Sequence, residues 1–121
     1  MTTVLIVEDT MTEAAIIGGT LRAAGFETVE ATSSEDAKVK LGQRKPDLIV
    51  LDVVLPGESG FEFCRDLKDK PETTGIPIVM CSTKDSEMDK FWGMKQGASA
   101  YLTKPVVPDE LVRTVKLLTK G

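Results

Sequence analysis

The sequence predicts an α/β protein whose parallel sheet is covered by helices on both faces, and three observations lead to this fold class. Three short runs are apolar at every position, as in strands buried on both faces: residues 4–7, 48–51 and 78–81. Segments of helical period separate these runs along the chain. Strand and helix then alternate five times, an order that favours parallel pairing through right-handed crossovers.

Each further element has a local signal. Thr10 and Glu13 form a capping-box pattern that opens a first helix, which ends near Gly25. Residues 28–31 alternate between apolar and polar, as in an edge strand, and residues 100–103 give a short fifth strand. The remaining helices are expected at residues 33–42, 61–68, 85–96 and 109–119, the last of them behind Pro108.

Length and composition fit one compact domain over residues 1–121, and we expect no output domain. The chain is 41% hydrophobic, but no run approaches the roughly 18 apolar residues of a membrane span. The N-terminus carries no signal-like segment, so we expect a cytoplasmic protein. A formal charge of −4 argues against nonspecific binding to nucleic acid or to acidic membranes.

Two residue types narrow the chemistry further. The chain has no histidine, so Ser-His, Cys-His and histidine-metal mechanisms are excluded. Cys64 and Cys81 fall in an expected helix and an expected buried strand, without the spacing of a zinc site. We expect two buried thiols rather than a disulfide or a metal centre.

Polar residues follow the expected strands at their carboxyl ends, the edge at which open α/β sheets bind ligands. These residues are Glu8, Asp9, Asp52, Ser82, Thr83 and Lys104. Three neighbouring carboxylates repel one another unless their pKa values rise or a cation binds between them. Mg²⁺ suits such a site, because it prefers carboxylates and water and leaves positions open for phosphate oxygens.

Transfer of a phosphoryl group to a carboxylate is the reaction that these residues favour. A Mg²⁺ ion would neutralise the phosphoryl charge while a carboxylate oxygen of Asp52 attacks phosphorus. Lys104 would pair with the phosphoryl oxygens, and Ser82 and the backbone N–H groups of Val53 and Thr83 would donate further hydrogen bonds. Each residue alone also fits an ordinary turn or helix-dipole role. Their convergence from four strand ends favours the functional interpretation.

With these residues in place, the whole chain resembles the receiver domains of response regulators in two-component signalling, of the chemotaxis type. The matching motifs are Glu8-Asp9, the Asp-x-x-x-Pro-x-x-x-Gly run at residues 52–60, Ser82, Gly97-Ala98, Tyr101 and Lys104-Pro105. This resemblance implies a flavodoxin-like doubly wound (βα)5 fold with a five-stranded parallel sheet in the order 2-1-3-4-5.

The resemblance also implies how the site binds its phosphoryl group and its Mg²⁺ cofactor. Asp52 would accept the phosphoryl group from the histidine of a sensor kinase. Asp9 would bind Mg²⁺ directly, Glu8 through water and Val54 through its backbone carbonyl. Lys104 would contact the phosphoryl group.

A switch is implied by the same resemblance. A cis bond before Pro105 would orient the preceding lysine. Ser82 would turn to hydrogen-bond the phosphoryl group and Tyr101 would rotate inward, changing the surface of the fourth helix, fifth strand and fifth helix. Thr83 stands where the family usually has a smaller residue, and would crowd the site and alter dephosphorylation.

The fourth expected helix carries a candidate partner surface. Phe91 and Met94 are expected to face the sheet beside Gly93, whereas Trp92 points outward one turn from Met88. An exposed Trp-Met pair would form a docking patch, with Trp92 folded back on its own helix as the alternative. The expected partner surface consists of Lys84, Met88, Trp92 and Lys95.

The segment 83–105 is similar to stand-alone receivers of the chemotaxis-like pathways that govern type IV pilus twitching. This similarity implies a chemotaxis-type histidine kinase as one partner. The output would be binding to a downstream protein or drainage of phosphate, by a monomer or a phosphorylation-dependent dimer. The self-phosphorylation and dephosphorylation of receivers would be its only catalysis, so we do not expect an enzyme.

Other functions fit the sequence less well. A phosphohydrolase with an aspartate nucleophile needs a second acid two residues later, where this chain has Val54, and the same absence disfavours a toprim-like nuclease. A nucleotide-binding domain needs a glycine-rich turn after the first strand. A receiver fold that only docks and is never phosphorylated stays as the main alternative.

Overall fold

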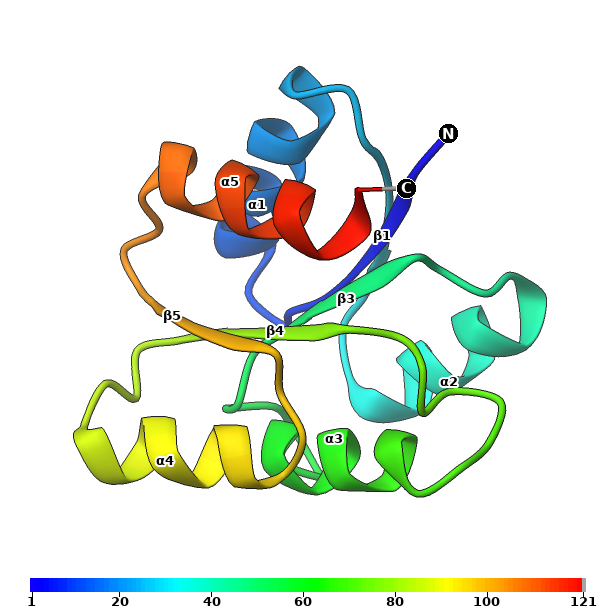
Figure 1. The fold of residues 1–121 in the computed structure, drawn as a ribbon, viewed down its shortest axis with the longest axis vertical. Helices are drawn as coiled ribbons and strands as arrows, with labels where there is room; N and C mark the ends of the chain where they lie inside the picture. Colours follow the sequence, from blue (N-terminus) through cyan, green and yellow to red (C-terminus); the bar gives the residue numbers. More distant parts are fainter. Residues whose placement is uncertain (121) are drawn as a thin grey trace.

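Five parallel strands form one sheet in the order β2-β1-β3-β4-β5 (Figure 1). The computed structural model describes residues 1–120. The strands are β1 (Thr3–Val7), β2 (Glu27–Ala31), β3 (Leu48–Leu51), β4 (Ile78–Ser82) and β5 (Ala100–Thr103). The helices are α1 (Met11–Ala23), α2 (Ser34–Gln43), α3 (Gly60–Lys68), α4 (Glu87–Lys95) and α5 (Pro108–Thr119). The predicted fold class and strand order are therefore confirmed.

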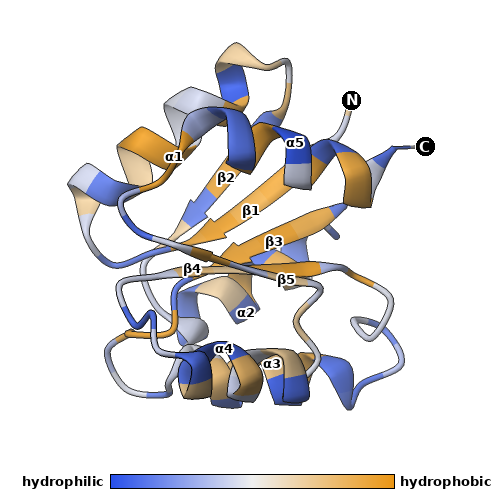
Figure 2. Cartoon of the chain, turned by 60° about the vertical axis from the view of Figure 1, so that its left-hand side comes forward, coloured by the Kyte–Doolittle hydropathy of each residue, from blue (hydrophilic) through white to orange (hydrophobic). Residues whose placement is uncertain are grey.

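Helices cover both faces of the sheet, with α1 and α5 on one face and α2, α3 and α4 on the other (Figure 1). Alternate strand residues supply two separate cores. Leu5 and Val7 of β1 pack with the α3 side, whereas Val4 and Ile6 pack with the α1 and α5 side. Figure 2 shows the hydrophobic residues concentrated along the central strands. The continuous apolar runs thus arise because each strand must fill two cores.

Helix starts show where a local prediction was wrong. Thr10 is the N-cap of α1, but its side chain makes no capping hydrogen bond. Its backbone N–H, which Glu13 would accept in a capping box, instead donates to Glu8 Oε2 at 3.1 Å. Complete capping boxes occur at α3 and α4, where Ser59 and Ser86 are the N-caps.

Two simpler expectations concern the thiols and the membrane. Cys64 and Cys81 are both buried and free, as predicted. Burial raises the pKa of Cys64 to about 11 and that of Cys81 to about 12, so both thiols are protonated at neutral pH. Within residues 1–120, none of the helices combines the length and the apolar character that crossing a membrane requires.

Candidate functional site

The carboxyl ends of the strands bring three charged side chains together. Glu8 directly follows β1, Asp52 follows β3, and Lys104 follows β5. Backbone bonds continue the sheet to these positions, since the Asp52 N–H donates to the Val7 carbonyl at 3.0 Å and the Lys104 N–H to the Ser82 carbonyl at 2.9 Å. The sheet itself therefore fixes the backbone of the site.

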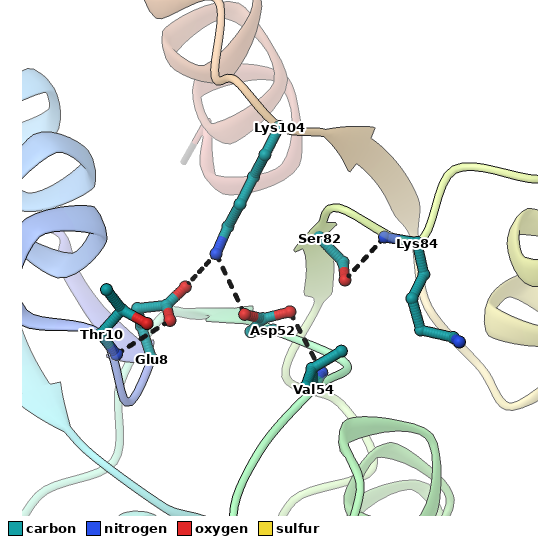
Figure 3. A network of polar contacts seen from close by, with 7 residues as sticks. All are labelled: Glu8, Thr10, Asp52, Val54, Ser82, Lys84 and Lys104. Atoms are coloured by element: carbon teal, nitrogen blue, oxygen red, sulfur yellow. Dashed lines mark hydrogen bonds and ion pairs between the residues drawn. The ribbon is translucent and has the colours of Figure 1, made fainter.

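An ion-pair triad occupies the centre of this edge. The Lys104 ammonium donates to Glu8 Oε1 at 2.5 Å and to Asp52 Oδ2 at 3.0 Å, as Figure 3 shows. The side chains of Lys104, Glu8 and Asp52 are 7%, 1% and 8% exposed. Charges with so little contact with water need partners, and each of the three has one here.

Burial and pairing have opposite effects on the pKa values of Glu8 and Lys104. Burial raises the pKa of the Glu8 carboxyl, and its bond to Lys104 only partly opposes this effect. For Lys104, burial would lower the pKa, but the bonds to Glu8 and Asp52 outweigh it, so the pKa is raised. Lys104 is therefore a cation at neutral pH, placed against the two carboxylates.

A third carboxylate adjoins the triad and completes an oxygen-rich cluster. Glu8, Asp9 and Asp52 each offer one ligand oxygen, and these atoms all lie within 4.8 Å of one another. Glu8 and Asp52 are buried, whereas Asp9 is exposed. When ionised, the three carboxylates carry more negative charge than the single Lys104 ammonium compensates. An all-oxygen donor set with excess negative charge fits a hard divalent cation such as Mg²⁺.

The loop after β3 holds the Asp52 carboxylate in place. The Val54 N–H donates to Asp52 Oδ1 at 3.2 Å, and the Val54 side chain is 55% exposed. Gly60 lies so close that a Cβ there would fall 2.1 Å from the Asp52 carbonyl oxygen. Its N–H donates to the carbonyl of the buried Val53 at 2.8 Å. Only glycine permits this approach of α3 to the loop, a requirement that the spacing of the motif did not reveal.

Of the predicted switch residues, Ser82 ends β4 and Tyr101 lies on β5. Buried Ser82 accepts a hydrogen bond from the Lys84 N–H at 3.2 Å, next to Asp52 in Figure 3. The Tyr101 hydroxyl donates to the Lys84 carbonyl at 2.5 Å, and partial burial raises its pKa to about 12. Thr83 is exposed. The bond between Lys104 and Pro105 is cis, as the resemblance implied.

On α4 the structure both confirms and corrects the expected orientation. Met88 and Trp92 are exposed as predicted, at 73% and 45%. The prediction that Phe91 and Met94 face the sheet is wrong, since they are 60% and 47% exposed. Gly93 is the buried residue of α4.

Close packing at this glycine explains the correction. A Cβ at Gly93 would lie 2.7 Å from Met80 Sδ and 2.9 Å from Tyr101 Cδ2. Met80 and Tyr101 already fill the space under α4, so its large apolar side chains turn outward. We use the name α4 patch for the resulting exposed set, which extends the two residues expected from sequence: Met88, Phe91, Trp92 and Met94. Lys84 and Lys95 are exposed as well.

Comparison with known families decides what this site belongs to. The family described as the response regulator receiver domain matches residues 4–116. The chain belongs to this family. Receiver domains are chiefly signalling modules.

Individual relatives agree with this assignment. The chain is 39% identical over 121 residues to protein PilH of Pseudomonas aeruginosa, covering 100% of both chains. It is 42% identical to the phosphate regulon transcriptional regulatory protein PhoB of the same organism, but spans only 52% of that protein. The solved structure of the chemotaxis protein CheY4 of Vibrio cholerae superposes with a TM-score of 0.90 at 31% identity, covering 98% of each chain. The expected similarity to PilH-type receivers is confirmed.

Proposed function

We propose that this chain is a stand-alone, cytoplasmic response regulator in which Asp52 accepts a phosphoryl group from a histidine kinase in a Mg²⁺-dependent reaction. The observation that carries the proposal is the triad of Lys104, Glu8 and Asp52, buried at the carboxyl edge of the sheet with Asp9 beside it. A buried carboxylate held next to a cation and further acids suits phosphoryl transfer better than a structural role.

The residues of the chain would divide the work of this reaction. Asp52 would form a bond from a carboxylate oxygen to phosphorus while the bond from phosphorus to the kinase histidine breaks. The Val54 N–H holds one Asp52 oxygen, and the Lys104 ammonium is placed to pair with a phosphoryl oxygen. Glu8, Asp9, Asp52 and the Val54 carbonyl would hold Mg²⁺, which supplies charge neutralisation when bound.

Phosphorylation of Asp52 would change the surface at α4 through Ser82 and Tyr101. The Ser82 hydroxyl accepts from the Lys84 N–H, and the Tyr101 hydroxyl donates to the Lys84 carbonyl, so one backbone segment connects both side chains. A phosphoryl group that draws Ser82 towards it would move this segment, which leads directly into α4. The α4 patch, with Lys84 and Lys95, would then change its affinity for a downstream protein.

The similarity to PilH supports a place in a chemotaxis-like pathway of type IV pilus twitching. We propose a chemotaxis-type kinase as the phosphoryl donor. A downstream protein or a role as phosphate sink would be the output, with the receiver as a monomer or a phosphorylation-dependent dimer.

Intact-mass spectrometry after incubation with acetyl phosphate, with and without Mg²⁺, tests the proposal. We expect a Mg²⁺-dependent gain of one phosphoryl group, lost in Asp52→Asn and kept in the matched control Asp85→Asn, which changes an exposed aspartate. Lys104→Ala should retain much of the Mg²⁺ binding and uncouple the response. A folded protein that gains no phosphoryl group would instead favour the docking-only alternative, in which the α4 patch acts without Asp52.

A further inference from the structure

A concave site lies at the end of the sheet opposite to Asp52. It is a cavity of about 380 Å³ between α2 and α3, which we name the α2–α3 pocket. Lys45 and Ile76, which line it, precede β3 and β4, whereas Asp52 follows β3. The volume lies in the range of roughly 300–1,000 Å³ that is typical of small-molecule sites.

The floor of the pocket is part of the hydrophobic core. Phe63, Leu67 and Ile76 are 0%, 4% and 2% exposed and belong to the core on the α3 side of the sheet. Leu41 of α2 packs against the same core and lines the pocket as well. The first three side chains are already shielded from water, so the half-buried Leu41 is the apolar side chain of this floor that a ligand group would cover.

The rim of the pocket carries more positive than negative charge, in a chain whose net charge is −4. Lys38, Lys45 and Lys70 line it together with the two acids Asp66 and Glu72. Lys38 lies 3.5 Å from the Glu58 carboxylate. Among residues 1–120, neither Lys45 nor Lys70 has a carboxylate within 4.0 Å. These two ammonium groups are thus available to an anion.

One residue that lines the pocket, Gly42, has no side chain. Gly42 lies on α2, and no atom lies within 4 Å of the point where its Cβ would be. Glycine within a helix lowers helix stability, and no close contact requires it here. A larger side chain at this lining position would therefore have room to extend.

We propose that the α2–α3 pocket binds a small amphiphile made of an apolar chain and one anionic headgroup, as in a medium-chain carboxylate. The chain would lie against Leu41, at the floor that it forms with the buried Phe63, Leu67 and Ile76, and the headgroup would pair with Lys45 and Lys70. Both ends of the ligand then meet matching chemistry within one cavity. The proposal does not depend on phosphorylation of Asp52, because the two sites lie at opposite ends of the sheet.

Titration with sodium decanoate below its micellar concentration, followed by amide NMR, tests the proposal. We expect saturable shifts at Gly42, Phe63, Leu67 and Ile76. Affinity should fall about fourfold for each methylene removed on going to octanoate. A decyltrimethylammonium ion, with the same chain and the opposite charge, should bind at least about tenfold more weakly.

Two sets of variants make the test specific to the pocket. Gly42→Leu fills open space and should weaken decanoate binding by at least about tenfold. The matched control Gly19→Leu changes an α1 glycine that also has open space and should leave binding unchanged. Lys45→Gln combined with Lys70→Gln changes only exposed residues and should remove the preference for the anion.

Several results would overturn the proposal. Equal affinity of Gly42→Leu and Gly19→Leu for decanoate would do so, as would equal affinity for the two oppositely charged amphiphiles. Amide shifts centred on the α4 patch would do so as well. Absence of saturable shifts would overturn it too. Acetyl phosphate labelling of the same variants is expected to be unchanged, which keeps this test separate from that of Asp52.

Discussion

Helices α3 and α4 have the same length and the same kind of start, yet they meet the sheet in opposite ways. Each has 9 residues and opens with a capping box, from Ser59 and Ser86 respectively. The buried residues of α3 are Gly60, Phe63, Cys64 and Leu67, whereas Gly93 is the buried residue of α4. The two helices therefore start with the same capping pattern and differ in how they pack against the sheet.

This difference gives the two helices different roles: α3 supports the site, and α4 exposes a surface. Through Gly60, α3 is packed against the backbone of Asp52, the proposed phosphoryl acceptor. α4 keeps its large apolar side chains in solvent, in the α4 patch. Elements with few buried apolar contacts open and move at low free-energy cost. The site thus adjoins the helix that buries its large side chains, while the helix proposed to change its partner affinity exposes them.

The largest expected effect comes from truncating one phenylalanine in each helix. Phe63→Ala removes a fully buried ring, so we expect a loss of about 3–5 kcal/mol in the free energy of unfolding. Phe91 is 60% exposed, and Phe91→Ala should change that free energy by no more than about 0.5 kcal/mol. Urea denaturation of both variants measures the difference. Similar losses from both would show that α4 is packed as firmly as α3.

Thiol reactivity gives a second contrast between the helices. Burial raises the pKa of Cys64 on α3 to about 11, whereas a thiol introduced by Met88→Cys would be exposed in the first turn of α4, where the helix N-terminus lowers its pKa from about 8.5. The introduced thiol should therefore react with iodoacetamide on the order of a hundredfold faster than Cys64 at neutral pH. Mass spectrometry of peptides over time measures both rates. Equal rates would mean that α3 opens readily.

Close packing at Gly93 predicts an intermediate effect. Gly93→Ala would press a methyl group against Met80 and Tyr101, and we expect a loss of about 1–3 kcal/mol. Tyr101 is the single tyrosine of the chain, so phenolate absorbance reports its pKa, which should fall from about 12 towards 10 as the ring is displaced. Gly19→Ala, where there is open space, should instead stabilise the protein by about 0.5–1 kcal/mol. An unchanged Tyr101 pKa in Gly93→Ala would refute the packing argument.

The two helices also mark what sequence reasoning can reach. On α3 the buried Phe63 and Leu67 are four residues apart and lie on one side of the helix, as helical periodicity requires. On α4, helical spacing predicted that Phe91 and Met94 face the sheet, and this prediction was wrong. The large side chains of Met80 and Tyr101 leave room only for a glycine at the contact. Met80 lies on β4 and Tyr101 on β5, so the contacts that orient α4 are tertiary. They cannot be predicted from the sequence of α4 alone.

The candidate site was more predictable than α4 because strand ends in a parallel sheet share an edge. Glu8, Asp52 and Lys104 meet there as expected. The hydrogen bond from Thr10 to Glu8 was missed, because it replaces a capping box that the local pattern favoured. Whether the Thr10 N–H donates to a buried carboxylate or to a capping residue depends on which acceptor lies closer in the folded structure. The spacing of residues in the sequence does not give that distance.

The smallest expected effect is a pH response confined to the start of α4. The Ser86 hydroxyl donates to the Asp89 carboxylate at 2.8 Å, and this bond lowers the pKa of Asp89 below its ordinary value of 3.8. A lowered pKa means that the stabilisation is present above the unfolded value and is lost as the pH falls through the folded value. The protection factors of amides in the first turn of α4, which allow for the slower intrinsic exchange in acid, should therefore fall below about pH 4, before the core unfolds.

Substitution at position 89 separates this local effect from general acid unfolding. Asp89→Asn should remove this pH-dependent fall in protection, because the side chain no longer titrates, while Asp109→Asn in the first turn of α5 should leave it in place. A fall in protection that persists in Asp89→Asn would assign it to another group. If instead α3 loses protection at the same pH as α4, the two helices unfold as one unit, and the contrast in their packing does not extend to their dynamics.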